Sequence, residues 1–557
     1  MEIGVAIYQE HTPSFADKLA TRQSAVLNSP SNLFFGGRFD RVCDWWVIAL
    51  LIMAVSWRLI AFFLRMPMWG DEAMLDLNIM NRSLSQMLRP LDYGQVAPPL
   101  FLIGEWLMQH IFGSSEFAVR LLPLAAGLAA VVIFWQWSRM LLGSLGTLIA
   151  VGFFALGYYL VRHSVEMKPY SMDQFASLCL YFLGTAWLIK PKPFYLLAAA
   201  VLMPILFGLS YPVVFVAGGL CLAVVVELLK NRSIANWFAW FIYTVATLIS
   251  FLAVLKIAGE GQYQQTAPAM LAYWQDSFPP HNPFRFVIWL INIHTGNMFA
   301  YPVGGRNGGS TATFLLFLVG LAVFYQRKRK FLVLLLAPFA LTFIAAVMQR
   351  YPYGGSDRVA QHLAPVICLL AGAGVASLVE WFVQRKDWIS ATPYVAGILF
   401  MIVGIIGITK DIIHPYKTPA DQKARQIVEN VLSLQRGGSG VAVLQRQSAV
   451  PVNFQLYLRW SGNGIIWNAL ADQTWTYMPT PHWVELNFDS NLSGNALLPQ
   501  SNNAQDIWQV TGQDTWYVQI GPQQYGPTFC QAVYLTKGLA ASNSAATTTN
   551  EPSLQPQ

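Results

Sequence analysis

Residues 45–64 read WWVIALLIMAVSWRLIAFFL, an apolar run with a single charge at Arg58. A helix needs about 20 predominantly apolar residues to cross the hydrocarbon core of a bilayer, and this run has that length. Similar runs recur along the 557-residue chain, of which 55% is hydrophobic and only 11% is charged. This composition excludes an ordinary soluble protein and predicts a polytopic α-helical membrane protein.

Outward from this run, hydropathy predicts about 11 transmembrane helices. The expected spans are 45–64, 118–138, 143–160, 171–189, 194–209, 211–229, 237–256, 311–325, 331–348, 359–383 and 392–409. A further apolar stretch, 97–112, is short, opens with Pro98-Pro99 and contains Glu105. We expect it to be a juxtamembrane or re-entrant helix in the first exterior loop.

The basic residues predict the topology. The densest basic clusters lie in the loops at 190–192, 230–232, 327–330 and 385–386. If successive spans cross the membrane in alternate directions, all four clusters lie on the same side of it. Arg38 and Arg41 lie on that side too only if the stretch 97–112 does not cross the membrane. Since basic loops favour the cytoplasmic side, we expect a cytoplasmic N-terminus and an exported C-terminus. This rule also explains most of the net charge of +7, which therefore does not indicate nucleic-acid binding.

The composition changes after about residue 410. Residues 418–435 have helical spacing, and short β-rich or alternating runs follow at 440–444, 452–458, 516–520 and 532–535. These patterns predict a small exterior α/β domain. The expected organisation is a cytoplasmic segment at 1–44, a transmembrane domain at 45–410, the α/β domain at 411–540 and a disordered tail at 541–557. The five cysteines show no metal or redox spacing, and a disulfide framework is not expected.

Directly after the first span the chain reads Met68-Trp69-Gly70-Asp71-Glu72-Ala73. Acids beside a bilayer tend to mark function, and a carboxylate there can take a proton from an acceptor hydroxyl. The alternative is that both acids cap a short interfacial helix, because carboxylates are favoured in a first helical turn. Both interpretations remain open on this motif alone.

Several basic residues lie on the predicted outer side, against the positive-inside trend. They are Arg65, Arg82, Arg89, Arg120, Arg162, Lys168, Arg350 and Arg358. Arginine and lysine at helix ends often snorkel to lipid head groups. Clustered near two carboxylates, they also suit an anionic, lipid-linked substrate.

Three exterior loops contain most of the unusual polar residues. One reads Arg162-His163-Ser164-Val165-Glu166-Met167-Lys168-Pro169-Tyr170, and another reads Arg350-Tyr351-Pro352-Tyr353-Gly354-Gly355-Ser356-Asp357-Arg358. The long loop at 257–310 contains His294. Each has an ordinary alternative, namely a surface Glu–Lys pair, an interfacial turn with belt tyrosines, and a structural histidine.

Over about the first 380 residues the chain resembles the C-type membrane glycosyltransferases, among them the protein O-mannosyltransferases and the lipid A aminoarabinose transferases. The resemblance lies in four motifs in the same order: Asp71-Glu72, Phe112-Gly113 with Phe117-Ala118-Val119-Arg120-Leu121, Glu166 to Tyr170, and Gly354 to Arg358. The Glu-Lys pair that aminoarabinose transferases carry near the end of the first exterior loop is replaced by Tyr93-Gly94-Gln95-Val96. That departure removes a likely metal ligand.

The resemblance implies transfer of a hexose or pentose from a polyprenyl-phosphate donor to a protein, lipid or glycan on the outer face of a bacterial inner membrane. It implies an inverting single displacement, with Asp71 as the catalytic base and Glu72 beside it. The predicted substrate-binding residues are Glu166, Lys168, Tyr170, His294, Arg358, Arg120 and Tyr211, the last in a tight exterior turn. No cofactor is assigned, and a divalent metal ion remains possible.

Two other functions fit the same chain. A lipid or glycolipid transporter would place charges and paired repeats near the bilayer midplane. Here the ionisable residues concentrate at the outer ends of the spans, and Arg58 is expected to snorkel from its helix. A scaffold that binds partners through its exported domain is the second alternative.

Overall fold

The computed structural model describes residues 37–230, 233–305, 308–382, 386–436, 441–445, 452–461, 482–487, 507–518 and 528–538. The chain divides into two compact units. The membrane unit contains Met1–Met66 and Asn78–Pro415, and the C-terminal unit contains Pro67–Leu77 and Tyr416–Gln557. The predicted tail at 541–557 and most of the predicted segment at 1–44 lie outside the described residues.

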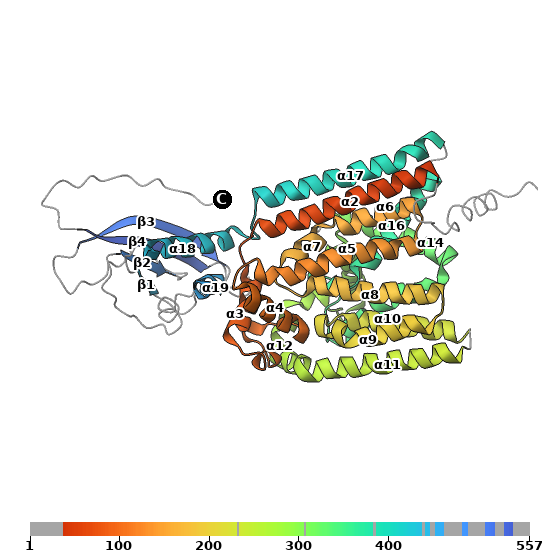
Figure 1. Ribbon diagram of the computed structural model, residues 1–557, viewed down its shortest axis with the longest axis horizontal. Helices are drawn as coiled ribbons and strands as arrows, with labels where there is room; N and C mark the ends of the chain where they lie inside the picture. The colour runs from red at the N-terminus through yellow and green to blue at the C-terminus, as the bar shows by residue number, and fades with distance from the viewer. Residues whose placement is uncertain are drawn as a thin grey trace, which may run out of the picture. The chain divides into compact units, whose positions relative to one another are not determined.

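The long helices of the membrane unit run side by side (Figure 1). The helices of this unit, long and short, are α2 (Arg38–Phe63), α4 (Pro99–Phe112), α5 (Leu121–Leu141), α6 (Ser144–Ala155), α7 (Tyr158–Arg162), α8 (Tyr170–Ile189), α9 (Pro193–Leu209), α10 (Val213–Leu228), α11 (Ile234–Val254), α12 (Glu260–Tyr273), α13 (Pro283–His294), α14 (Gly308–Arg327), α15 (Leu332–Val347), α16 (Ala364–Phe382) and α17 (Lys386–Ile413). Helix α3 (Gly70–Asn81) begins in the C-terminal unit and ends in the membrane unit. Helices α2 and α17 pack together, and the Trp57 indole N–H donates to Asp411 Oδ2 at 2.7 Å.

Eight helices in the described part of the chain are long and apolar enough to cross a membrane, and the bent pair Ser144–Ala155 and Tyr158–Val165 makes nine. Helices α9 and α10 are apolar but shorter. The chain is therefore an integral membrane protein. A count of 11 requires α9 and α10 to cross as well, and that count stays a prediction.

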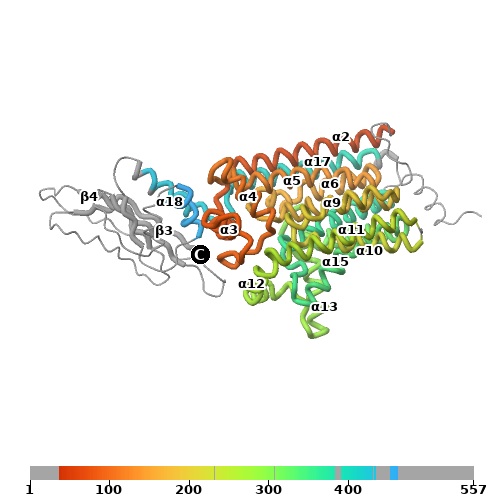
Figure 2. Tube along the Cα trace, turned by 60° about the horizontal axis from the view of Figure 1, so that its bottom comes forward, coloured from red at the N-terminus to blue at the C-terminus, as the bar shows by residue number. Residues whose placement is uncertain are grey.

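Both ends of α4 lie at the same end of the membrane unit. Before α4, Gln95 accepts a hydrogen bond from Lys168 at 2.6 Å, and after α4, Glu116 pairs with Arg65 at 3.1 Å. Figures 1 and 2 show α4 and α12 at one end of the long helices. Helix α4 therefore does not cross the unit, as predicted for residues 97–112.

The opposite end brings together loops that were predicted to be cytoplasmic. Lys330 Nζ donates to the Leu188 carbonyl at 3.3 Å, and Asn236 Nδ2 donates to the Pro191 carbonyl at 3.1 Å. The basic loops at 190–192 and 327–330 thus meet at one end, as the alternation of spans requires. Which end faces the cytoplasm stays a prediction.

Arg58 holds the break in the bent span instead of snorkelling. It is 0% exposed, and its Nη1 donates to the Ala155 carbonyl at 2.8 Å, where α6 ends. Its Nε donates to the Ser164 hydroxyl at 3.2 Å, beyond the 54° bend. A helix that breaks inside a bilayer leaves carbonyl groups that need donors, and Arg58 supplies one.

Replacing Arg58 with methionine should destabilise the protein. The substitution leaves the Ala155 carbonyl and the Ser164 hydroxyl without this donor, which should cost about 2–4 kcal/mol. Thermal unfolding of purified protein in detergent measures the loss. Arg329→Met, in an exposed arginine that lies over Tyr325, is the control. Equal melting temperatures for the two variants would contradict this role.

The C-terminal unit contains two helices and a four-stranded sheet. Its helices are α18 (Pro419–Arg436) and α19 (Val452–Trp460), and its strands are β1 (Val441–Gln445), β2 (His482–Asn487), β3 (Ile507–Val518) and β4 (Thr528–Gly538). The strand order is β1-β2-β4-β3, with β1 parallel to β2 and the other pairs antiparallel. Helix α18 coincides with the predicted helix at 418–435.

The prediction of a β-rich run at 452–458 is wrong, because these residues form α19. The run is too short for its apolar pattern to separate helix from strand. Phe454, Tyr457 and Leu458 share one helical face and are buried there. Pro451, which precedes the helix in the sequence, suits a helix start.

Candidate active site

A buried histidine joins two loops that were predicted to be exterior. His163 Nδ1 lies 2.9 Å from Glu166 Oε2, and its Nε2 lies 2.6 Å from Asp357 Oδ2. All three side chains are buried. An ionised carboxylate only accepts hydrogen bonds, so two such neighbours fit a doubly protonated imidazolium. We name His163, Glu166 and Asp357 the histidine bridge.

The histidine bridge fixes the chain on which two predicted phosphate-binding cations lie. Glu166 is two residues before Lys168, and Asp357 directly precedes Arg358. Arg162 Nε adds a contact of 3.4 Å to Glu166 Oε1, and the Tyr170 ring lies 4.7 Å from the His163 ring. Predicted residues Glu166, Lys168 and Tyr170 therefore belong to one cluster, which His163 and Asp357 complete.

Lys168 is buried and bonded to the first exterior loop. Its ammonium donates to Gln95 Oε1 at 2.6 Å, and the two residues are 6% and 8% exposed. Gln95 stands in the segment where the aminoarabinose transferases carry their Glu-Lys pair. A neutral amide there supports the lysine by hydrogen bonding without cancelling its charge.

Arg120 and Tyr211 both bind backbone oxygen atoms. Arg120 Nη1 donates to the Met66 carbonyl at 2.6 Å, which fixes the chain just after α2. The Tyr211 hydroxyl lies 3.1 Å from the Ala97 carbonyl and 3.1 Å from Gln262 Oε1. These contacts join loops at the same end of the membrane unit, and a role for either residue in substrate binding stays a prediction.

His294 lies in a different environment, among aromatic side chains. Its Nδ1 is 2.8 Å from the Leu290 carbonyl, so it donates there, and its Nε2 accepts from the Tyr353 hydroxyl at 3.2 Å. Burial lowers the pKa of His294, which favours this neutral form. A neutral histidine with both nitrogens bonded is a weaker phosphate ligand than Lys168. Arg358 lies over the Trp274 ring at 5.3 Å and donates to the Tyr273 hydroxyl at 3.1 Å.

The two adjacent acids of α3 have different environments in the C-terminal unit. Glu72 is 1% exposed, and its Oε2 lies 3.4 Å from the Trp69 backbone nitrogen, as in the second half of a capping box. Asp71 is half-buried. The capping interpretation therefore describes Glu72, and Asp71 is the more accessible carboxylate.

Sequence reasoning missed three residues of these clusters. His163 and Asp357 were quoted within their loops but given no role, and Gln95 was noted only for what it replaces. The pairing of His163 with Asp357 joins residues 194 positions apart, which no local pattern reveals. The sequence did predict that the loops containing His163 and Asp357 lie on the same side of the membrane, and this was the one indication that they could meet.

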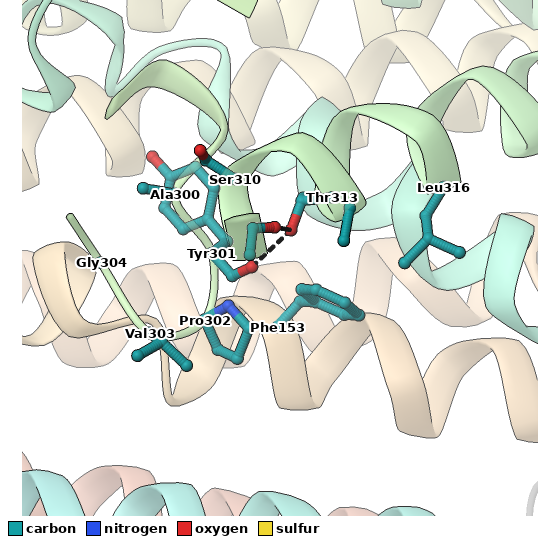
Figure 3. A pocket seen from close by; sticks show the side chains of 11 residues that line it. Phe153, Ala300, Tyr301, Pro302, Val303, Gly304, Ser310, Thr313 and Leu316 are labelled. Carbon is teal, nitrogen blue, oxygen red and sulfur yellow. Dashed lines mark hydrogen bonds between the residues drawn. The ribbon is translucent and has the colours of Figure 1, made fainter. Parts of the chain in front are cut away.

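Figure 3 shows a cavity of about 210 Å³ between α6 and α14. Phe153, Leu316 and the segment 300–304 line it, and the Thr313 hydroxyl donates to the Tyr301 carbonyl at 2.6 Å. The described residues around it include no charged side chain. Those residues are mostly apolar and offer no positive charge to a phosphate.

Among the described residues, no group of three or more His, Cys, Asp or Glu side chains is placed so that it could hold a metal ion. In the histidine bridge the two acids face opposite ring nitrogens and do not converge on a common point.

Comparisons with known proteins give structural matches only. No protein-family model matches the sequence, and no curated protein matches it. The fold is similar to ArnT from Cupriavidus metallidurans bound to undecaprenyl phosphate, with 12% identity, 80% of this chain and 93% of that chain covered, and a TM-score of 0.48. It is also similar to the oligosaccharyltransferase AglB from Archaeoglobus fulgidus in complex with an inhibitory peptide and a dolichol-phosphate. For this second match the identity is 11%, the alignment covers 79% of this chain and 69% of that chain, and the TM-score is 0.40.

Both likenesses concern the fold alone.

Removing the central imidazole should destabilise the membrane unit. His163→Gln replaces the imidazole between two buried carboxylates with a neutral amide, and breaking a buried ionic contact in this way costs about 3–5 kcal/mol. Thermal unfolding in detergent measures the effect. Lys230→Gln, which breaks an exposed 3.3 Å pair with Glu227, is the control and should change the stability by less than about 1 kcal/mol. A histidine variant as stable as the control would exclude a charged bridge.

Asp421 should give the C-terminal unit a pH-dependent stability. Burial raises its pKa from 3.8 to about 6, the Glu72 charge adds to the rise, and Thr418 and Lys417 oppose it. Asn453 Nδ2 also lies 3.3 Å from Asp421 Oδ1. Because the folded state holds the proton more tightly, this residue favours folding below pH 4, and the contribution is lost as the pH rises through about 6.

The free energy of unfolding should therefore fall by up to about 3 kcal/mol over this pH range. Asp421→Asn should remove most of this fall, and Glu429→Gln, on the exposed side of α18, should leave it unchanged. Unfolding of full-length protein at a series of pH values measures the difference. An identical pH profile for wild type and Asp421→Asn would refute the assignment.

Proposed function

We propose that this chain is a C-type membrane glycosyltransferase that moves a hexose or pentose from a polyprenyl-phosphate donor to an acceptor on the outer face of the membrane. The observation that carries the proposal is the meeting of charged side chains from three loops at one end of the membrane unit. Lys168 joins the second exterior loop to the first, and the histidine bridge joins it to the loop at 349–358. Buried ionisable groups at a membrane surface are typical of a functional site.

The cations of this end suit a lipid phosphate. Negative charge grows on the phosphate as the glycosidic bond breaks, and preorganised positive groups stabilise it most in the transition state. Lys168, held by Gln95 and with its backbone fixed by the histidine bridge, is proposed as the main phosphate ligand. Arg358 and Arg120 are proposed to support it, with Tyr170 and Tyr211 near the sugar, and His294 holds a peripheral place.

Asp71 is proposed to deprotonate the acceptor hydroxyl. A general base must reach the proton that it abstracts, and Asp71 is the more accessible of the two acids. Glu72 is proposed to hold the first turn of α3 through the Trp69 amide. One displacement, activated by one carboxylate, inverts the anomeric carbon and needs no protein nucleophile.

The proposal includes a topology of 11 spans with the C-terminal unit outside, in a bacterial inner membrane. The transporter alternative lacks its main support, because Arg58, the one charge in the apolar run 45–64, binds the broken α6–α7 span. That contact gives Arg58 a structural role.

Turnover of labelled polyprenyl-phosphate sugars by protein in lipid nanodiscs tests the proposal. Asp71→Asn should lower kcat by about 10²- to 10⁴-fold, because it removes the base. Glu72→Gln keeps an oxygen for the Trp69 amide and should retain most activity, since glutamine also serves in a capping box. Asp92→Asn, in an exposed acid paired with Arg82, is the control.

Equal donor consumption by wild type and Asp71→Asn would refute Asp71 as the base. Movement of the sugar-lipid across the bilayer without consumption of any donor would favour the transporter.

A further inference from the structure

The segment that carries Asp71 belongs to the C-terminal unit. Pro67–Leu77 groups with Tyr416–Gln557, and its neighbours on both sides in the sequence group with the membrane unit. Two hydrogen bonds join this segment to α19, one on each side of Asp71 in the sequence. The Met68 amide donates to the Tyr457 hydroxyl at 2.7 Å, and the Trp460 indole N–H donates to Asp76 Oδ2 at 2.8 Å.

The bond between Met68 and Tyr457 is buried, and the bond between Trp460 and Asp76 is partly buried. Asp76 is 0% exposed and Tyr457 is 7% exposed. A buried carboxylate is costly unless it is hydrogen-bonded, so loss of the Trp460 indole would favour release of α3 from α19. Both bonds therefore act on the position of α3.

A third contact lies between these two. Lys417 Nζ is 3.3 Å from the centre of the Trp69 ring, directly before the first turn of α3. Glu72, which caps that turn, acts on the pKa of Asp421 in α18. The first turn of α3 is thus in contact with the start of the C-terminal unit as well as with α19.

We infer that the C-terminal unit positions the proposed base, with Tyr457 and Trp460 of α19 as positioning residues for Asp71. The inference rests on the proposed function of Asp71. Proton transfer depends on placing the base within hydrogen-bond reach of the acceptor, and a misplacement of about 1 Å can lower the rate about 10²-fold. The bonds at Met68 and Asp76 hold the backbone on either side of Asp71, and neither uses its carboxylate.

The experiment compares Tyr457→Phe and Trp460→Phe in full-length protein in lipid nanodiscs. Tyr457→Phe removes the acceptor and keeps the ring, and Trp460→Phe removes the indole donor and leaves a smaller aromatic ring. Amide hydrogen exchange in residues 67–77 should become about fivefold faster, the effect of losing one buried hydrogen bond. With the same donor, kcat should fall about 10- to 100-fold at unchanged donor KM, because only the placement of the base is altered.

Matched controls lose equivalent bonds in the membrane unit. Trp187→Phe removes an indole bond of 3.1 Å to Asn236, and Tyr243→Phe removes a hydroxyl bond of 2.9 Å to the Ala217 carbonyl. Neither should alter exchange in residues 67–77. A second pair of variants tests rescue: Asp76→Asn keeps an oxygen for the Trp460 indole and should restore most of the kcat that Asp76→Leu loses.

Unchanged exchange at 67–77 in Tyr457→Phe and Trp460→Phe would overturn the inference, as would faster exchange with unaltered kcat. The exchange measurement needs no donor, so it separates the two proposals. If wild type consumes no donor, or Asp71→Asn is fully active, the proposed function fails, and so does the role of α19 in placing a base. Faster exchange would then show only a structural attachment.

Discussion

The imidazole of His163, held between the carboxylates of Glu166 and Asp357, is the interaction on which one end of the membrane unit depends. Loops at the ends of separate helices have no backbone ladder to hold them, so side chains must do so. Low dielectric strengthens a paired ionic contact and penalises an unpaired one. The bridge therefore fixes two loops together and, through the chain, the backbone of Lys168 and Arg358.

The same constraint explains the other polar groups of the membrane unit. Arg58 supplies a donor where α6 ends inside the unit, and Tyr211 and Gln262 bond the Ala97 backbone just before α4. Each of these side chains bonds a backbone group, as a bilayer interior without water requires. Arg58 thus supports the backbone, whereas Lys168 and Arg358 are the proposed phosphate ligands.

The sequence was sufficient for what depends on local pattern. Hydropathy located the long apolar helices, and the structure brings the basic loops at 190–192 and 327–330 together at the end away from α4. The sequence could not reveal the pairing of His163 with Asp357, which depends on how helices pack. The sequence also predicted a β-rich run at 452–458, where α19 forms, because so short an apolar pattern does not distinguish a helix from a strand.

Asp71 and Glu72 have different environments because they are adjacent residues in the first turn of α3. Adjacent residues on a helix point about 100° apart, so a first turn that buries one acid presents its neighbour differently. Glu72 faces back to the Trp69 amide at the start of α3. Asp71 is left as the carboxylate that a substrate could reach. The two adjacent acids therefore differ in the proposal: Glu72 caps α3, Asp71 is the proposed base, and α19 bonds the chain on either side of them.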